Sequence, residues 1–259
     1  MKNDVIIAGP GGNYTAFVIA PTELSKRMAL DKKLRCEDPR IEQVCFVTRD
    51  AIGWHGDMTG GEFCGAAALS LGFLIMEWEN SSTARFNFSG APQPISVNKN
   101  YGQVSSTLFP NITCHIQTLE KDITCVRLPG IVHLVTYNPR PEISISEYFK
   151  KLIARYALAN EPAVGLMRVQ DNGGSPAIDP WVWVRDINSL INETACISGA
   201  AAVGLIIHQQ KNQVDTTIKI RQPCSTITKL HYRANSSNNT VSVTVTSKIM
   251  RAQTLMKTG

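Results

Sequence analysis

Two stretches of this 259-residue sequence decide how we expect the chain to fold. The first reads Gly60-Gly61-Glu62-Phe63-Cys64-Gly65-Ala66-Ala67-Ala68-Leu69-Ser70-Leu71-Gly72, and the second reads Asn192-Glu193-Thr194-Ala195-Cys196-Ile197-Ser198-Gly199-Ala200-Ala201-Ala202-Val203-Gly204. Each has a Glu shortly before a Cys, a run of small residues after it, and a closing Gly. Because the two cysteines lie about half the chain apart, this echo indicates a duplicated domain with one cysteine at the same place in each half.

The residues after each cysteine indicate a buried helix. Both Ala-rich runs lead into apolar residues, and Ala is the best helix former. We therefore expect Cys64 and Cys196 to lie at helix N-termini. There the unpaired N–H groups and the positive end of the helix dipole stabilise a thiolate or bind a carboxylate. Glu62 and Glu193 are expected only to favour the start of each helix.

The rest of the chain is typical of β-strands. Its candidate strands are β-branched, partly alternating and bounded by Gly, Pro, Asn or Asp. They cover residues 5–8, 15–20, 43–48, 84–88, 103–107, 113–118, 123–128, 132–137, 164–169, 181–184, 216–220, 228–233 and 241–247. Amphipathic helices are expected at 146–158 and, more weakly, at 21–30. Two mostly β halves, each around one Ala-rich helix, predict the α+β class.

Composition and charge exclude several classes of protein. A chain that is 43% hydrophobic buries a full core, and it has no apolar run long enough for a transmembrane helix. The net charge of +5 is scattered, which argues against a nucleic-acid partner. The N-terminus lacks a signal peptide, so we expect a cytoplasmic protein with reduced cysteines and no membrane contact. The Cys and His spacing suits no metal site.

Two thiols on facing helix N-termini suggest one reaction. A substrate carboxylate held between the helix ends places its α-carbon between the two sulfurs. One sulfur, as a thiolate, removes the α-proton, and the other, as a thiol, delivers a proton to the opposite face. The α-carbon is then inverted without a cofactor or metal. This mechanism predicts one thiolate and one thiol in the resting site.

At these residues the sequence resembles the diaminopimelate epimerase superfamily, whose halves carry Cys-Gly-Asn and Ala-Cys-Gly-Thr/Ser-Gly motifs. Further matches follow in order: Gly12-Asn13, Glu42-Gln43, and Gly130-Ile131-Val132-His133 for Gly-Asn-Pro-His. The resemblance covers nearly the whole chain. It implies two pseudo-symmetric domains, each a mostly antiparallel β-cage around a central helix, with the active site in the cleft between them. We expect residues 1–118, completed by 246–259, to form the first domain and 119–245 the second.

The resemblance also implies roles for site residues. Cys64 and Cys196 are the expected catalytic pair, and His133 is expected near their thiols. Asn13 is expected to contact the substrate, and Glu42 or Gln43 to recognise the substrate side chain, Glu42 through an imidazole N–H. The remaining substrate-binding positions are those at the helix starts, where main-chain N–H groups hold the carboxylate: Gly65, Ala66, Ile197 and Ser198. Ala66 and Ile197 depart from the usual Asn and Gly.

Departures from the superfamily pattern favour one branch. Diaminopimelate epimerases bind the distal end of their substrate with asparagines and an Arg, and here Ile131, Ile187 and Asn188 stand at such positions. The motifs instead resemble the histidine racemase branch, which supplies D-histidine for opine-type metallophores. The resemblance implies an amino acid substrate, no cofactor, and no partner beyond a second copy of the chain.

Two alternatives remain open. In the first, the chain is an epimerase of the diaminopimelate or proline type. A phenazine-pathway isomerase fits less well, because those enzymes lack the paired cysteines. In the second, the chain is a non-catalytic binding protein of the same fold, which Ala66 and Ile197 favour. Exchange of the substrate α-proton in D₂O separates these hypotheses.

Overall fold

The computed structural model describes residues 4–113, 115–137, 143–170 and 174–251. The strands of the first half are β1 (Asp4–Gly9), β2 (Tyr14–Ile19), β3 (Ile41–Arg49), β4 (Trp54–Met58), β5 (Thr83–Phe88), β6 (Ile95–Asn100) and β7 (Gln103–Thr113). Its helices are α1 (Leu24–Glu37) and α2 (Gly65–Trp78). The chain then enters a second half that repeats this order of elements with two additional strands.

The strands of the second half are β8 (His115–Glu120), β9 (Ile123–Leu128), β10 (Ile131–Thr136), β11 (Ala163–Gln170), β12 (Ala177–Val184), β13 (Ser189–Asn192), β14 (Asp215–Arg221), β15 (Ile227–Asn235) and β16 (Thr240–Ser247). Its helices are α3 (Ile145–Arg155) and α4 (Ile197–Lys211). A short last strand, β17 (Met250–Arg251), returns to the first half and pairs with β1. None of the helices in the described ranges is long and apolar enough to cross a membrane.

The pairing of the strands shows the duplication directly. In the first half β2 runs parallel to β3 and β4 to β5. In the second half β10 runs parallel to β11 and β12 to β14, at the equivalent places. The other pairings between described strands are antiparallel, and β7 pairs with β16 to join the halves. This is the pseudo-symmetric α+β architecture that the sequence predicts.

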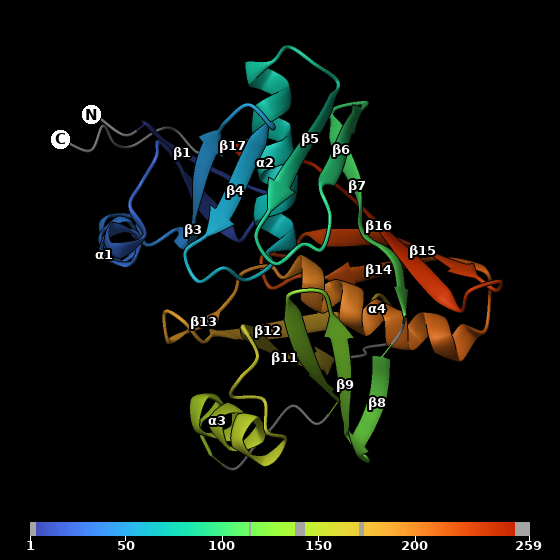
Figure 1. The fold of residues 1–259 in the computed structure, drawn as a ribbon. Coiled ribbons are helices and arrows are strands. Elements are labelled where there is room, and N and C mark those ends of the chain that lie inside the picture. Colours follow the sequence, from blue (N-terminus) through green and yellow to red (C-terminus); the bar gives the residue numbers. More distant parts are fainter. Residues whose placement is uncertain (1–3, 114, 138–142, 171–173, 252–259) are drawn as a thin grey trace.

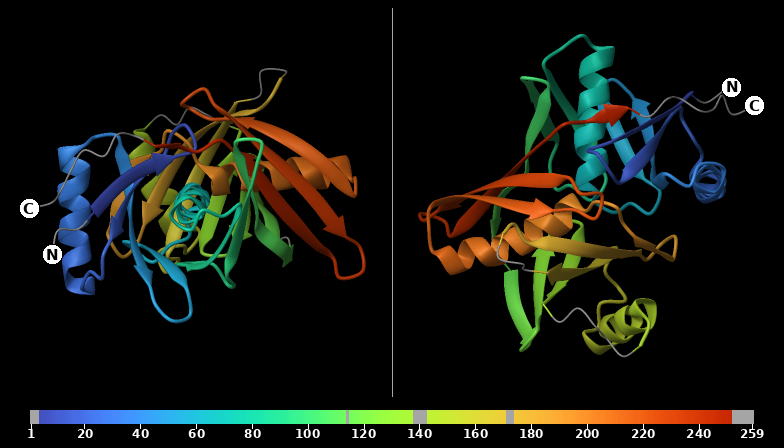
Figure 2. Two further views of the ribbon diagram at one scale, coloured as in Figure 1. Left: turned by 90° about the horizontal axis from the view of Figure 1, so that it is seen from above. Right: turned by 180° about the vertical axis from the view of Figure 1, so that it is seen from behind.

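Each half wraps its strands around its Ala-rich helix (Figure 1). Seen from above, α2 stands end-on inside a ring of strands (Figure 2). Small side chains let the strands come close, and the Gly that closes each repeat shows why. A Cβ added to Gly72 would lie 2.4 Å from Val97 of β6, and one added to Gly204 would lie 2.0 Å from the Tyr232 hydroxyl of β15. Any larger residue would push the equivalent strand away from its helix.

The two outer helices cover the other face of their strands. Leu34 of α1 packs with Val18 and Phe46 in one apolar cluster, and Phe149 of α3 packs with Leu134 in another. Side chains alternate along β10: Val132 and Leu134 face the cluster under α3, and Ile131 and Val135 face the central core. The helices expected at 21–30 and 146–158 are α1 and α3 with shifted ends.

The sequence did not predict every strand of the structure. The strand β4 was missed because His55, Gly56 and Asp57 have low strand propensity, although Gly56 is required where Leu71 and Phe88 approach its backbone. The strands β6, β13 and β17 were missed as well. The strand expected at 113–118 is divided between β7 and β8, and residue 114 lies outside the described residues. The domain boundaries at 118 and 245 remain predictions. The last strand, β17, pairs with β1 of the first half.

Candidate active site

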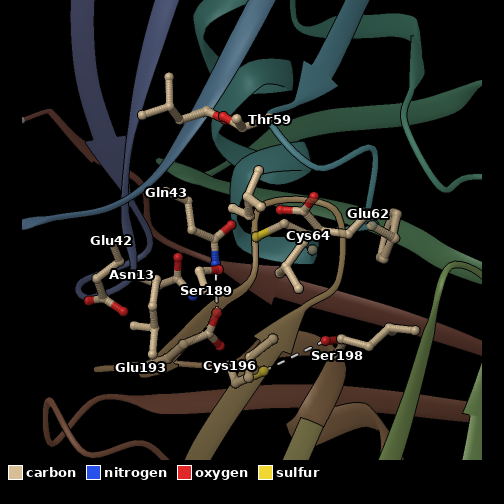
Figure 3. A pocket seen from close by; sticks show the side chains of 18 of the residues that line it. Asn13, Glu42, Gln43, Thr59, Glu62, Cys64, Ser189, Glu193, Cys196 and Ser198 are labelled. Carbon is tan, nitrogen blue, oxygen red and sulfur yellow. Dashed lines mark hydrogen bonds between the residues drawn. The ribbon is translucent and has the colours of Figure 1, made fainter. Parts of the chain in front are cut away.

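A pocket lies where the N-termini of α2 and α4 face each other between the two halves (Figure 3). It is lined by both cysteines and by a mixed set of polar and apolar side chains from each half. These residues are Asn13, Asp31, Arg35, Glu42, Gln43, Val44, Thr59, Glu62, Phe63, Cys64, Gly65, Ile131, Val182, Val184, Ile187, Ser189, Ile191, Glu193, Cys196, Ile197 and Ser198. The pocket therefore brings together most of the residues that the sequence singles out.

The two cysteines are the N-caps of their helices, as predicted. The sulfur of Cys64 accepts a hydrogen bond from the N–H of Ala67 at 3.4 Å, and the sulfur of Cys196 accepts one from Gly199 at the same distance. The Ser198 hydroxyl lies 3.6 Å from the Cys196 sulfur. The two capping hydrogen bonds repeat the same local geometry in both halves, whereas the Ser198 contact has no counterpart because Ala66 stands at the equivalent position.

The protonation of the thiols differs from the expectation. Burial raises the pKa of both Cys64 and Cys196, and the nearby Glu193 carboxyl acts in the same direction on each. Hydrogen bonds from the helix N-termini lower both values but do not outweigh burial. Burial therefore favours the thiol form of both groups in the unliganded pocket, whereas the sequence analysis predicts one thiolate and one thiol.

The ends of α2 and α4 touch through one unusual pair. A Cβ added to Gly65 would lie 2.9 Å from Cγ2 of Ile197. The bulk of Ile197, where the superfamily has Gly, is therefore accommodated by the missing side chain of Gly65. Both residues are buried and line the pocket. Their backbone N–H groups belong to the first turns of the two helices, where carboxylates are bound well.

One group of polar side chains lies beside Cys196. Gln43 donates from Nε2 to Oε1 of Glu193 at 2.6 Å, across the two halves. Asn13, at a φ of 50°, donates from Nδ2 to the carbonyl of Ala195 at 2.6 Å. Three buried oxygens remain without a hydrogen-bond partner among the described residues: Asn13 Oδ1, Gln43 Oε1 and Glu193 Oε2. We call these three residues the acceptor cluster.

The carboxyl of Glu193 is almost fully buried in this cluster. Burial raises its pKa from 4.5 to about 8, although the polar groups of Cys196, Asn13 and Gln43 beside it act in the opposite direction. Glu62 has the same character in the other half, because burial raises its pKa to about 7. Its oxygen Oε2 also has no partner among the described residues. Each half thus places one buried carboxyl next to its cysteine (Figure 3).

Glu42 lines the pocket but is already engaged. Its two carboxylate oxygens accept hydrogen bonds from Thr194, one from the backbone N–H at 3.0 Å and one from the hydroxyl. The Thr194 hydroxyl oxygen also accepts from the N–H of Asn13 at 2.8 Å. Glu42 therefore joins the two halves. Because both of its oxygens already accept hydrogen bonds, it is less available to bind the substrate side chain than the sequence predicts.

His133 is not among the residues that line the pocket. It lies on the same face of β10 as the pocket residue Ile131, but two residues further along the strand and therefore deeper. Its ring is fully buried against Gly165, with Met167 next to that glycine, and neither ring nitrogen has a partner among the described residues. Burial lowers its pKa to about 3. The imidazole is therefore a neutral group of the core that does not line the pocket, and its expected nearness to the thiols stays a prediction.

The other predicted residues are placed as follows. Gly65, Ile197 and Ser198 line the pocket, whereas the buried Ala66 does not, although its N–H acts on the Cys64 sulfur. Sequence reasoning missed the roles of Glu62 and Glu193, whose repeated place before each cysteine was the available signal. It also missed Asp31 and Arg35, a hydrogen-bonded pair from α1 that lines the pocket. Among the described residues no group of His, Cys, Asp and Glu could hold a metal ion.

A family model and a curated relative both match this chain, and both are described as histidine racemases. A family model described as the histidine racemase CntK N-terminal domain matches residues 4–253. A histidine racemase from Fusobacterium nucleatum subsp. nucleatum is 27% identical over 225 residues, which cover 81% of this chain and 82% of that protein.

Solved structures share the fold at low identity. A phenazine biosynthesis protein of the PhzF family from Bacillus anthracis has a TM-score of 0.68 at 8% identity, with 98% of each chain covered. A hydroxyproline epimerase from Agrobacterium vitis has a TM-score of 0.60 at 10% identity, with 96% of this chain and 90% of that chain covered.

Proposed function

Because this chain belongs to the histidine racemase family, we propose that it interconverts L- and D-histidine by proton transfer to and from two cysteines, without a cofactor. The chain is an isomerase of the amino acid racemase and epimerase class. The single observation that carries the mechanism is the pair of equivalent helix N-termini, which bring Cys64 and Cys196 to one pocket.

The substrate carboxylate binds at the facing ends of α2 and α4. Main-chain N–H groups of the first turns, at Gly65 and Ile197 among others, carry no side-chain requirement and complement the negative charge. Hydrogen bonds from these groups also stabilise the charge that develops on the carboxylate when the α-proton leaves. This arrangement uses the two positions, Ala66 and Ile197, whose side chains depart from the superfamily pattern.

The α-ammonium binds the acceptor cluster. An ammonium has three N–H donors and no acceptor, and Asn13, Gln43 and Glu193 supply three oxygens that lack other partners among the described residues. The bound cation also places a positive charge near the sulfurs. This charge opposes the effect of burial on the thiols and favours the thiolate that the reaction needs.

Once the bound substrate favours release of one thiol proton to solvent, the reaction needs only two proton transfers. The thiolate sulfur on one side takes the α-proton and becomes a thiol. The carbanion electron pair is delocalised into the carboxylate, and the opposite thiol gives its proton to the other face of the α-carbon and becomes a thiolate. Protons balance, and the two cysteines have exchanged their states. Reaction in the reverse direction uses the same groups in the opposite roles.

The apolar wall of the pocket favours histidine over a substrate with a second charged end. Ile131 and Ile187 line the pocket and cannot pair a distal carboxylate or ammonium. An unpaired charge buried against such side chains is costly. The role implied by the sequence resemblance, D-histidine supply for opine-type metallophores, is part of this proposal.

Solvent exchange tests the proposal. Purified protein is incubated in D₂O with L-histidine, meso-diaminopimelate or trans-4-hydroxy-L-proline, and α-deuterium and the opposite enantiomer are followed by NMR and chiral chromatography. We expect exchange and D-histidine from L-histidine, at a kcat/KM at least about a hundredfold above that for meso-diaminopimelate. Turnover should survive exhaustive dialysis with a chelator. Faster exchange of either other substrate would contradict histidine as the substrate, and binding without exchange would indicate a non-catalytic protein.

A further inference from the structure

One buried carboxyl in the pocket has no part in the two proton transfers. Glu62 lies two residues before Cys64, and only 6% of its surface is exposed. Its oxygen Oε2 has no hydrogen-bond partner among the described residues, and the side chain lies beside Cys64 in the pocket (Figure 3). A carboxylate that only stabilised a helix N-terminus would have no reason to be buried there, since the helix dipole acts on exposed charges too.

We propose that Glu62 determines the side-chain specificity of the site by accepting, on Oε2, a hydrogen bond from a ring N–H of the substrate. The inference rests on the proposed function, because it assigns the side-chain subsite of that same pocket. It names the chemical class that the subsite takes: a flat, mostly apolar ring that carries an N–H donor.

Two aliphatic side chains of the second half lie close to Gly60 together with the Glu62 carboxyl. A Cβ added to Gly60 would meet Val184 Cγ1 at 2.5 Å, Glu62 Oε2 at 2.8 Å and Ile187 Cγ1 at 3.7 Å. The free oxygen therefore lies in the same small region of the pocket as two aliphatic side chains of the second half, both of which line the pocket. One acceptor in an aliphatic wall suits a ring with apolar faces and one N–H, and it does not suit a side chain that ends in a carboxylate.

The other carboxylates of the pocket are less suitable for this role. Both oxygens of Glu42 accept hydrogen bonds from Thr194, and Glu193 lies in the acceptor cluster beside Cys196. Asp31 is paired with Arg35 and also accepts from the Thr59 hydroxyl at 3.2 Å. Among the pocket-lining carboxylates, Glu62 is the one that combines an unpartnered oxygen with aliphatic neighbours.

The cost of burying Glu62 supports a binding role. Burial raises the pKa of its carboxyl to about 7, which shows that the unliganded pocket solvates the charge poorly. A buried acceptor without a partner destabilises the unliganded protein. Such groups are expected at binding sites, where the ligand completes the hydrogen bond.

The test removes the hydrogen bond from either side. The substrates are L-histidine and β-(4-thiazolyl)-L-alanine, whose five-membered ring has nearly the same shape but no N–H. The proteins are the wild type, Glu62→Gln, Glu62→Met and the matched control Glu42→Gln. For each pair, kcat/KM for α-proton exchange in D₂O is measured, with circular dichroism as a check on folding.

The wild type should prefer histidine over the thiazolyl analogue by at least about a hundredfold, because a site built to bond an N–H rejects a ring without one. The preference should shrink in Glu62→Gln and fall below about tenfold in Glu62→Met, while Glu42→Gln keeps it. Such a graded loss at Glu62 alone supports the assignment.

Three results would overturn the assignment. They are a wild-type preference below about tenfold, a preference that persists in Glu62→Met, and a preference lost in Glu42→Gln. The first of these does not depend on whether a variant folds. If the wild type exchanges no α-proton of histidine, the proposed function itself fails, which is a separate outcome from exchange that ignores Glu62.

Discussion

The carboxylate of Glu42 is bound at both oxygens by Thr194, although 152 residues separate the two in sequence. Thr194 lies just before the helix that carries Cys196, and Glu42 lies in the strand next to the Asn13 hairpin. The same hydroxyl accepts from the N–H of Asn13. This contact fixes the position of α4, which carries Cys196, relative to the first half. It therefore affects the distance between the two cysteines.

Removing the Thr194 hydroxyl should therefore loosen the junction. Thr194→Val loses one hydrogen bond to Glu42 and leaves the N–H of Asn13 without its acceptor. We expect a loss of about 1 to 2 kcal/mol in the free energy of unfolding, measured by urea denaturation. Thr217→Val, which removes an exposed hydroxyl, should change it much less. An unchanged stability in Thr194→Val would show that the contact does not hold the halves together.

The pair formed by Gly65 and Ile197 gives a second prediction. Gly65→Ala should separate the helix ends and lower kcat/KM for histidine by at least about tenfold, because small displacements of catalytic groups are costly. Adding Ile197→Ala should restore part of that loss, since it removes Cγ2, the atom that would lie nearest to the new Cβ. Losses that simply add in the double variant would show that the two positions do not interact.

The cysteine pair is tested by isosteric replacement. Cys64→Ser and Cys196→Ser keep the side-chain shape, but a hydroxyl is a far weaker acid than a thiol. Each should lower the racemisation rate of histidine by at least about a hundredfold while the far-ultraviolet circular dichroism is unchanged. Cys36→Ser, at an exposed position of α1, serves as the control with normal activity. Normal racemisation in either pocket variant would eliminate the two-thiol mechanism.

His133 predicts a dependence of stability on pH. Its pKa is about 3 in the folded protein and 6.5 when unfolded, so between these values only the unfolded chain binds the proton. Stability is therefore lost as the pH falls below 6.5, by about 1.4 kcal/mol per pH unit from this group. From pH 6.5 to 5 the wild type should lose about 2 kcal/mol more than His133→Leu, as measured by urea denaturation. Equal losses in the two proteins would mean that the ring gains a partner on acidification.

Much of the site follows from local sequence. The repeat around Cys64 and Cys196 is enough to predict two buried helices, because Ala content, small residues and the capping position act within a few residues of one another. Gly12-Asn13 and Glu42-Gln43 were found by their order along the chain. All four of Asn13, Glu42, Gln43 and Ser198 line the pocket.

Other features depend on contacts between residues far apart in the chain. The sequence places His133 in a matching motif, but the packing of β10 against β11 decides that its ring faces Gly165 in the core and lies outside the pocket. Glu42 matches an acidic residue expected to bind substrate, but Thr194 from the other half engages both of its oxygens. Neither partner can be inferred from the residues beside these positions.

The sequence by itself determined the duplication, the two capped helices and the cysteine pair, because helix formation and capping depend on neighbouring residues. Only the tertiary structure decided which polar groups keep a free oxygen in the pocket and which way burial moves the thiols. Those properties depend on desolvation and on hydrogen bonds across the two halves, as with Gln43 and Glu193 or Glu42 and Thr194. They arise only when β7 and β16 join the halves and close the pocket between α2 and α4.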